Sequence, residues 1–397
     1  MSNIYCAICC GPLVEVDIAS KPRSEAFKTA WQRGDDFDVK WEQTYDCEII
    51  TKEEAVWTTM IMLLGFNPKA SGPTNVAFLA PFGEIFDSSV TVDDSPDGSF
   101  TLDDTGSDEQ HFECYDVDGV DCPNEEPAFP FHPPCYWILQ RRLSNYFSGV
   151  TTIDKDVLYG VMRSLTATVS YLDINYGDLE KDFTCVRFWH SYAGEEVYAA
   201  NPGVVEGLEG RIQEMMATGY FRLPKYVELD LSHGVQKDPF KSLPFDILVT
   251  IAEMVEDPEC FMNWARASWS IHTFLRSAQN SFWKRTIRMQ MQWFFELDRF
   301  LEDDKLCHGS SMRAVFLWAA SGSKLRLGMK GGDFLRLANR RRIWTSPCKA
   351  LIDRYCEILP RHLLGEGGDF GYNKEYSSEE ESSENNEEVG GENSDED

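Results

Sequence analysis

The sequence has no apolar run long enough to cross a membrane. The longest, Ala55 to Phe66, is interrupted by Thr58 and Thr59 and is shorter than the roughly 18 residues that a membrane-spanning helix requires. The first residues also lack the basic segment and apolar stretch of a secretory signal. We therefore expect an intracellular protein, cytoplasmic or nuclear, with no membrane partner.

Basic residues are scarce. The 397 residues include 37 Lys and Arg against 66 Asp and Glu, which gives a formal net charge of -29. Such a chain repels the phosphate backbone, so no nucleic-acid partner is expected. Part of the acidity lies in residues 375–397, which are almost all Glu, Asp, Ser, Asn and Gly. We expect residues 367–397 to form a disordered acidic tail.

Internal repeats and catalytic motifs are also missing from the sequence. No period of roughly 20 to 50 residues recurs, which argues against solenoids and propellers. The chain has no nucleophile elbow, no phosphate-binding glycine loop, no dinucleotide fingerprint and no His-Glu-x-x-His. We therefore expect a protein that is not an enzyme.

Hydrophobic residues make up 43% of the chain and aromatic residues 13%, enough for several folded domains. We predict an α+β protein that is mainly α in its second half. The expected divisions are an N-terminal Cys/His domain at 1–149 with an acidic loop at 93–124, a mixed α/β connector at 150–237, a three-helix module at 238–287, C-terminal helices at 288–366 and the tail at 367–397.

Apolar spacing predicts the individual elements of these regions. A strand-like run is expected at Val186–Trp189. Helices are expected at Ser24–Arg33, Glu53–Leu64, Tyr136–Phe147, Asp154–Leu165, Val205–Met216, Ser311–Leu325 and Pro347–Leu359.

A basic island stands out in the C-terminal region. We interpret it as a solvated helix end that pairs with local carboxylates. The alternative is a surface that reads a phosphorylated target or an import receptor. Its members are Lys324, Arg326, Lys330, Arg336, Arg340, Arg341 and Arg342.

Two short motifs have the spacing of metal ligands. Cys6-Ala-Ile-Cys9 and His132-Pro-Pro-Cys135 each place two ligands close together, and the combined Cys3His set suits tetrahedral zinc. The twelve cysteines of a chain without a visible signal favour metal ligands or free thiols over a disulfide framework. The alternatives are packed thiols with a capped histidine, or competing ligands at His111, Cys114 and Cys122.

The module at 238–287 begins with an amphipathic helix. Pro244 suits a first helical turn, and Asp246 places negative charge near the positive end of the helix dipole. Asp257-Pro258 ends the helix. Its apolar residues recur three and four apart on one face: Leu243, Ile247, Leu248, Ile251, Met254 and Val255.

Two further helices follow in the expected module. The second presents Phe261, Trp264 and Ala265, and the third leads towards Phe282-Trp283-Lys284. Three short helices cannot cover such faces alone. A partner that buries the remainder gains free energy at roughly 25 cal/mol per Å² of apolar surface.

This module resembles the F-box family. The resemblance lies in the Leu-Pro-x-Asp-Ile-Leu-x-x-Ile opening, the Asp-Pro loop, the Ala-Arg-x-Ser run and the closing Phe-Trp-Lys, and it covers residues 238–287. It implies docking on a Skp-type adaptor and, through it, a cullin. The implied adaptor-binding residues are Leu243, Pro244, Ile247, Leu248, Ile251, Phe261 and Trp283.

The chain as a whole is similar to fungal F-box families that join a Cys-x-x-Cys start, a His-x-x-Cys-aromatic segment and a later F-box. The resemblance implies a non-catalytic substrate receptor for an unidentified protein, with ubiquitin transfer left to other subunits. The alternative is an interaction or scaffold protein whose F-box-like helices form an internal core. Solvent exposure of Leu243, Pro244, Ile247 and Ile251 discriminates between the two, because a docking face must be accessible.

Overall fold

The computed structural model is a mixed structure of helices and small sheets, as the predicted α+β class requires. Helices account for all regular elements after residue 132 in the part of the chain that is described. That part comprises residues 5–22, 44–67, 76–86, 89–92, 110–115, 126–147, 152–166, 171–177, 191–223, 238–255 and 257–363. The predictions for Ser24–Arg33, Val186–Trp189 and the tail at 367–397 lie outside it.

Within the described residues, six short strands form two antiparallel sheets, with orders β2-β1-β6 and β3-β4-β5. In the first sheet the central strand is buried on both faces, since Leu63 and Leu64 are both fully buried. Gly65 faces the ring of Phe78, where a Cβ would lie 2.4 Å from the ring carbon Cε1. The strands are β1 (Met62–Phe66), β2 (Ala77–Ala80), β3 (Glu84–Phe86), β4 (Ser89–Val92), β5 (Gln110–Glu113) and β6 (Phe129–Phe131).

The predicted helix at Glu53–Leu64 is largely wrong. A capping box formed by Thr51 and Glu54 starts α3 (Lys52–Ala55), and a 3-10 turn, η1 (Val56–Thr59), follows it. The chain is then extended and enters β1, which pairs with β2 on one side and β6 on the other. A short apolar run suits a buried strand as well as a buried helix, and here pairing on both sides selects the strand. The predicted acidic loop at 93–124 likewise contains β5, which pairs with β4.

The predicted helices at Tyr136–Phe147, Asp154–Leu165 and Val205–Met216 are confirmed, with ends shifted by up to three residues. Asp154 begins the second of them by accepting hydrogen bonds from the backbone N–H groups of Asp156 and Val157. The described helices between residues 132 and 237 are α4 (Pro133–Tyr146), α5 (Lys155–Ser164), α7 (Glu196–Ala199) and α8 (Leu208–Ala217).

The second half is helical, and the region predicted as three helices forms four. The chain is extended at Ala278 and Gln279, so the Phe282-Trp283-Lys284 segment lies on a helix of its own. The elements are α9 (Phe245–Met254), α10 (Pro258–Ala267), α11 (Trp269–Ser277), α12 (Asn280–Gln290), η3 (Phe295–Leu297), α13 (Asp298–Glu302), α14 (Met312–Gly322), α15 (Asp333–Thr345) and α16 (Pro347–Leu363).

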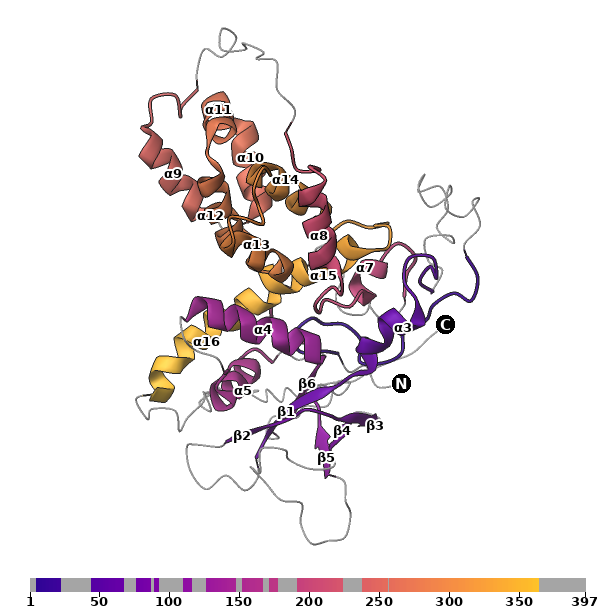
Figure 1. The fold of residues 1–397 in the computed structure, drawn as a ribbon. Coiled ribbons are helices and arrows are strands. Elements are labelled where there is room, and N and C mark those ends of the chain that lie inside the picture. Colours follow the sequence, from indigo (N-terminus) through magenta and orange to yellow (C-terminus); the bar gives the residue numbers. More distant parts are fainter. Residues whose placement is uncertain are drawn as a thin grey trace, which may run out of the picture.

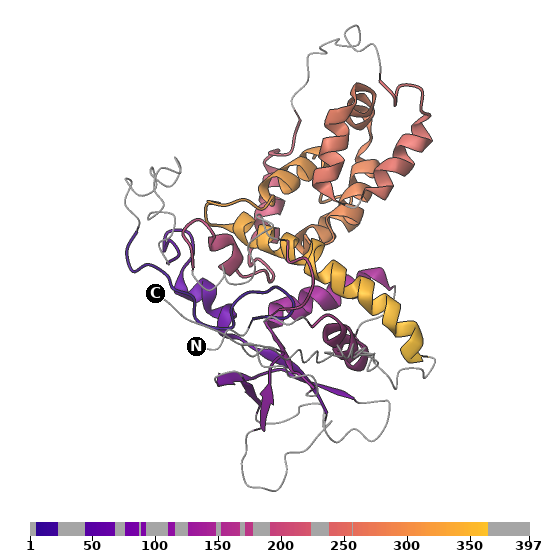
Figure 2. The ribbon, with the colours of Figure 1, turned by 180° about the vertical axis from the view of Figure 1, so that it is seen from behind.

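The helices α9 to α14 gather at one end of the molecule and the strands at the other (Figure 1). Seen from behind, α15 and α16 run between these two ends (Figure 2). The last helix packs beside α4 and α5, so the C-terminal helices cover the N-terminal half. One continuous hydrophobic core extends from Tyr5 to Tyr355. Among the described helices, none combines the length and the apolar character that crossing a membrane requires.

The interpretation of the basic island as a solvated helix end is wrong for three of its seven members. Lys324, Arg326 and Lys330 are exposed, as that interpretation requires. Three of its arginines lie on α15 in the protein interior, where the exposed fractions of Arg340, Arg341 and Arg342 are 0%, 7% and 4%. The interpretation failed because the carboxylate that neutralises Arg340 belongs to Glu296, far from α15 in sequence. Buried guanidinium groups require such partners, because an unpaired buried charge costs several kcal/mol.

Candidate metal centre

The first cysteine pair sits on a tight turn. The backbone N–H of Cys10 donates to the carbonyl oxygen of Cys6 over 2.8 Å, and that of Cys6 donates to Gly11 over 2.9 Å. The turn requires a left-handed backbone at Cys10, whose φ is 60°. This geometry folds residues 6 to 11 back on themselves and places Cys6 and Cys9 beside each other.

The second pair stands at the start of α4. His132 is the residue before the helix, Pro133 and Pro134 occupy the first two helical positions, and Cys135 follows in the first turn. Strand β6 leads directly into this start. The N–H of Ala7 donates to the carbonyl oxygen of Pro130 over 2.9 Å, and this bond joins the cysteine turn to the end of β6.

All four predicted ligands converge. The candidate ligand atoms of Cys6, Cys9, His132 and Cys135 lie within 4.8 Å of one another, and all four residues are buried. The Sγ atom of Cys9 is 3.4 Å from the Nδ1 atom of His132. A tetrahedral zinc ion with Zn–S bonds of about 2.3 Å separates its sulfur ligands by about 3.8 Å, so the cluster has the dimensions of a Cys3His site. The cluster could bind a metal such as zinc.

Backbone N–H groups surround two of the sulfur atoms. Cys6 Sγ accepts from the N–H of Cys9 and from that of His132, both over 3.4 Å, and Cys9 Sγ accepts from Gly11 over 3.3 Å. A Cβ at Gly11 would lie 3.3 Å from Cys9 Sγ and 3.4 Å from His132 Cε1, so a larger residue would crowd the ligands. Donors of this kind stabilise thiolate ligands and fix their orientation.

The imidazole of His132 is held in one orientation. Its Nε2 atom lies 3.0 Å from the carbonyl oxygen of Pro12 and 3.2 Å from that of Thr58. Carbonyl oxygens only accept hydrogen bonds, so Nε2 must be protonated, and Nδ1 is the atom directed at Cys9. The ring also packs at 4.6 Å from the ring of Trp57. Metal-binding histidines commonly donate their second N–H to a carbonyl oxygen in this way.

The side chains of the cluster shift one another's pKa values. Burial raises the pKa of the Cys9 thiol, but hydrogen bonds with Cys135 and Cys6 and the charge of His132 outweigh it and hold that pKa well below its usual value. Burial lowers the pKa of His132, yet the neighbouring Cys6 and Cys9 raise it to about 10. A metal ion would take the place of the Nδ1 proton, because its ligands bind in the deprotonated form.

The competing ligands do not join the cluster. Cys114 is buried in the core, where burial raises the pKa of its thiol, and it is not among the four converging residues. The side chain of His111 and all of Cys122 lie outside the described residues. Cys10 is disulfide-bonded, which departs from the expectation of free or metal-bound cysteines.

The supporting groups of the centre have little signal in the sequence. Pro12 and Thr58 contribute backbone carbonyl oxygens, which any residue type supplies. Gly11 is different, because a glycine two positions after the second cysteine of Cys-x-x-Cys is consistent with a tight metal-binding turn. Among these supporting residues, Gly11 is the one whose residue type in the sequence points to its role.

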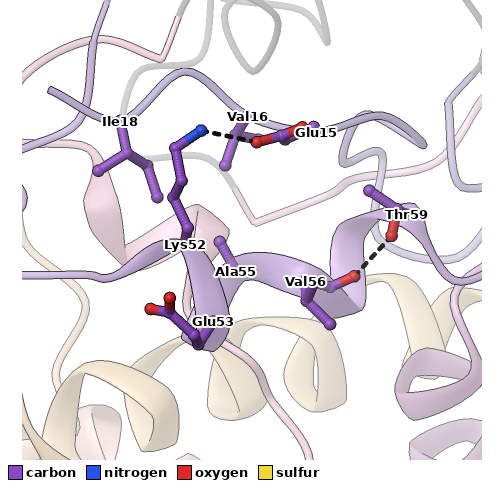
Figure 3. Close-up of a pocket in the computed structure, with 8 residues that line it drawn as sticks. All are labelled: Glu15, Val16, Ile18, Lys52, Glu53, Ala55, Val56 and Thr59. Atoms are coloured by element: carbon purple, nitrogen blue, oxygen red, sulfur yellow. Dashed lines mark hydrogen bonds and ion pairs between the residues drawn. The ribbon is translucent and has the colours of Figure 1, made fainter. Parts of the chain in front are cut away.

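A separate pocket of about 300 Å³ lies over α3 and η1 (Figure 3). None of the four cluster residues lines it. Val16, Ile18 and Ala55 belong both to its lining and to a small second hydrophobic core. Lys52 reaches across to Glu15 over 2.9 Å, as Figure 3 shows, and both side chains are exposed. The pocket thus holds an exposed ion pair above a small apolar core.

The predicted adaptor-binding residues divide into two groups. Leu248, Phe261 and Trp283 are buried in the core, with exposed fractions of 6%, 0% and 3%. Their assignment to a contact surface is corrected, because their side chains pack inside the helical bundle. Leu243 is half-buried.

The remaining predicted adaptor-binding residues, Pro244, Ile247 and Ile251, lie along one side of α9 together with Met254. Pro244, Ile247, Ile251 and Met254 follow each other at spacings of three, four and three, and we call this set the α9 stripe. Pro244 is exposed and Ile251 half-buried, while the exposed fractions of Ile247 and Met254 are 45% and 76%. The adjoining side of α9, about 100° round the helix, is buried through Leu248 and Ala252. Nearby Phe245, which the apolar spacing does not single out, is also exposed and packs its ring 5.0 Å from that of Phe274.

Comparison with known proteins assigns no family. No protein-family model, curated protein or solved structure matches the chain. The resemblance of residues 238–287 to the F-box family therefore remains a prediction that depends on those residues.

Proposed function

We propose that this chain is a non-catalytic substrate receptor of a ubiquitin ligase, folded around a structural zinc ion and docking on a Skp-type adaptor through α9 to α12. It would act in the cytoplasm or nucleus and reach a cullin through the adaptor. Its own role would be to hold a protein target, which raises the local concentration of that target at the subunits that transfer ubiquitin.

The α9 stripe is the observation on which the docking proposal rests. A soluble protein gains nothing from an exposed row of apolar side chains, whereas a partner that covers them gains roughly 1.5 to 3 kcal/mol for each fully buried large side chain. The helix lies at an outer edge of the molecule (Figure 1). An amphipathic helix with its inner side packed and its outer side apolar is suited to a hydrophobic groove on another protein.

The zinc proposal is supported by the donor set and its surroundings. Three thiols and an imidazole are the ligands of structural zinc sites, and a structural site uses all four positions for protein ligands. The cluster is buried, so no position is open to a substrate. Its role would be to join the turn at Cys6–Gly11 to the start of α4, two segments far apart in the chain.

A binding experiment with matched variants tests the docking proposal. Recombinant Skp-type adaptor should bind the folded chain, and the exposed-site changes Ile247→Glu and Met254→Glu should each weaken binding about tenfold or more. The control is Phe82→Glu, which places the same charge on an apolar residue beside the strands that is as exposed as Met254, at 77% against 76%. Circular dichroism should show all variants folded.

Two outcomes would reject the ligase role. One is a folded native chain that fails to bind the adaptor, and the other is a loss of binding in the Phe82→Glu control equal to that in the α9 variants. The alternative would then be an interaction or scaffold protein that uses the α9 stripe for a different partner.

A further inference from the structure

Three consecutive arginines of α15 point towards three different parts of the protein. Successive residues of an α-helix are rotated by about 100°, so neighbouring side chains leave it in different directions. Arg340 reaches Glu296 and the backbone of residues 202–203. Arg341 and Arg342 reach the helical bundle and the metal centre, respectively. One rigid helix therefore contacts both proposed functional regions.

Arg342 connects α15 to the cysteine turn. Its Nη1 atom donates to the carbonyl oxygen of Cys9 over 3.2 Å and to that of Tyr176 over 2.8 Å. Its Nε and Nη2 atoms donate to Oδ1 of Asn339 over 3.1 Å and 2.9 Å, which fixes the plane of the guanidinium. The group is thus positioned by its own helix to hold the backbone of a predicted metal ligand.

Arg341 connects the same helix to the junction between α9 and α10. Its Nη2 atom donates to Oδ1 of Asp257 over 3.0 Å, and its Nη1 atom donates to the carbonyl oxygen of Ala320 on α14 over 3.3 Å. The other carboxylate oxygen of Asp257 caps α10 by accepting from the N–H groups of Glu259 and Cys260 over 2.7 Å and 2.9 Å. The Arg341 contact therefore orients the cap that starts α10.

We propose that α15 transmits the metal state of the Cys/His centre to the helical bundle, so that loss of the metal loosens the start of α10 next to the α9 stripe. This inference rests on the proposed metal centre and names a means of regulating the proposed docking site. Without the ion, the turn that presents the carbonyl oxygen of Cys9 is less constrained, and Arg342 loses a fixed acceptor. Arg342 keeps Tyr176 and Asn339 as acceptors, but a buried N–H that loses its partner is unfavourable. We therefore expect α15 to shift slightly, and the neighbouring contact of Arg341 to Asp257 to shift with it.

Hydrogen exchange of the full chain tests this coupling, with zinc bound and after removal of zinc by a chelator. In the native chain, exchange at residues 259–262 should become about tenfold faster without zinc, which corresponds to about 1.4 kcal/mol of local opening free energy. Exchange in α5, which packs against α16 and β2, should change little. The affinity of the chain for the adaptor should also fall when the chelator removes zinc, and this affinity measures the effect on docking.

Two variants separate the proposed route from a general loss of stability. Arg341→Met should still bind zinc, but residues 259–262 should exchange at the same rate with and without it. Arg336→Met is the matched control, because Arg336 lies on α15 and donates to the carbonyl oxygens of Asn201 and Val204, away from α10. This control should keep the zinc-dependent difference of the native chain.

The possible contrary results distinguish failure of the coupling from failure of the metal centre and of the docking function. Unchanged exchange at 259–262 after zinc removal would overturn the coupling, and so would an equal loss of protection in α5. A native chain that takes up no zinc would refute the metal centre and the coupling together. A chain that shows the exchange response but binds no adaptor would retain the coupling and lose the docking function.

Discussion

Arg340 and Glu296 form a bidentate ion pair inside the protein. Nη1 of Arg340 lies 2.8 Å from Oε2 of Glu296, and Nη2 lies 3.0 Å from Oε1. Glu296 Oε1 also accepts from the N–H of Val205 over 2.8 Å, and Arg340 Nε donates to the carbonyl oxygen of Pro202 over 2.7 Å. Burial raises the pKa of Glu296, but the adjacent guanidinium outweighs burial and keeps that pKa below its usual value. The pair thus fastens residues 202–205 to η3 and α15.

Removing the arginine alone should be more harmful than removing both charges. Arg340→Met leaves an unpaired carboxylate in the interior and should lower the free energy of unfolding by roughly 3 to 5 kcal/mol. The double change Arg340→Met with Glu296→Gln should recover part of that loss. Urea denaturation of both variants measures the difference. Equal stability of the single and double variants would show that the buried charge is not the cause.

Metal analysis of the purified chain should find about one equivalent of zinc. Cys9→Ser should abolish it, because serine is a poor zinc ligand and the cluster would keep only three good donors. The matched control is Cys260→Ser, at an exposed cysteine of α10 that takes no part in the cluster. A chelator should lower the thermal midpoint of the native chain and leave that of Cys9→Ser unchanged. Zinc that persists in Cys9→Ser would place the site elsewhere.

The carboxyl group of Asp238 should make the free energy of unfolding fall as the pH falls. The N–H of Ser270 is the main cause that lowers the pKa of Asp238 to about 2, with a further contribution from the hydroxyl of Ser268. The pKa of an aspartate in the unfolded chain is about 3.9, which is higher than the pKa of Asp238 in the folded protein. The stabilisation from this group is therefore fully present above about pH 3.9 and is lost as the pH falls towards 2. Asp238→Asn should therefore be less stable than the native chain at pH 7 and equally stable near pH 2. Urea denaturation across this range measures the difference, and parallel curves would contradict the assignment.

The carboxyl group of Glu196 should make stability depend on pH in the opposite direction, so that the free energy of unfolding falls as the pH rises. Burial is the main cause that raises the pKa of its carboxyl group, and nearby Asp46 adds to it. Its Oε1 accepts from the N–H of Asp46 over 3.0 Å, whereas Oε2 is buried without a hydrogen-bond partner. A raised folded-state pKa stabilises the protonated form, so this contribution is present at low pH and is lost as the pH rises above the unfolded value of about 4.3. Glu196→Gln should remain neutral and be more stable than the native chain at pH 8. Denaturation at pH 5 and pH 8 checks this, and a variant that is less stable at pH 8 would refute it.

The sequence predicts a site well where its chemistry depends on the types of residues that lie a few positions apart in the chain. The two ligand pairs of the metal cluster each lie within four residues, so their residue types and spacing are evident from the sequence alone. Helices with clear starts, such as α5 after Asp154, are equally evident. The stripe on α9 follows from apolar spacing, although spacing does not tell which members face inward. Burial of Leu248 and Phe261 depends on the packing of α9 and α10 against other helices, and the sequence contains no measure of that packing.

The predictions for β1 and for the arginines of α15 failed because these segments interact with residues that are far away in the sequence. The apolar run that contains β1 suggests a helix because the strands that pair with it, β2 and β6, are separate segments of the chain. The arginines of α15 suggest an exposed surface because charge alone favours solvent, and their acceptors are a distant carboxylate and backbone carbonyl oxygens. Backbone acceptors have no signature in residue type. The interior of this protein thus contains charged groups that composition assigns to its surface.

The separation of the two ligand pairs also sets the order of events during synthesis. Cys6 and His132 are 126 residues apart, so at about 5 to 20 residues per second the ribosome needs roughly 6 to 25 s to add the second pair after the first. During that interval Cys6 and Cys9 are thiols on an unfinished chain, open to oxidation or to mispairing with other cysteines. Completion of the proposed zinc centre must await residue 135. If the chain takes up zinc there, the supply of zinc and the redox state around the nascent chain should influence how much of the protein matures correctly.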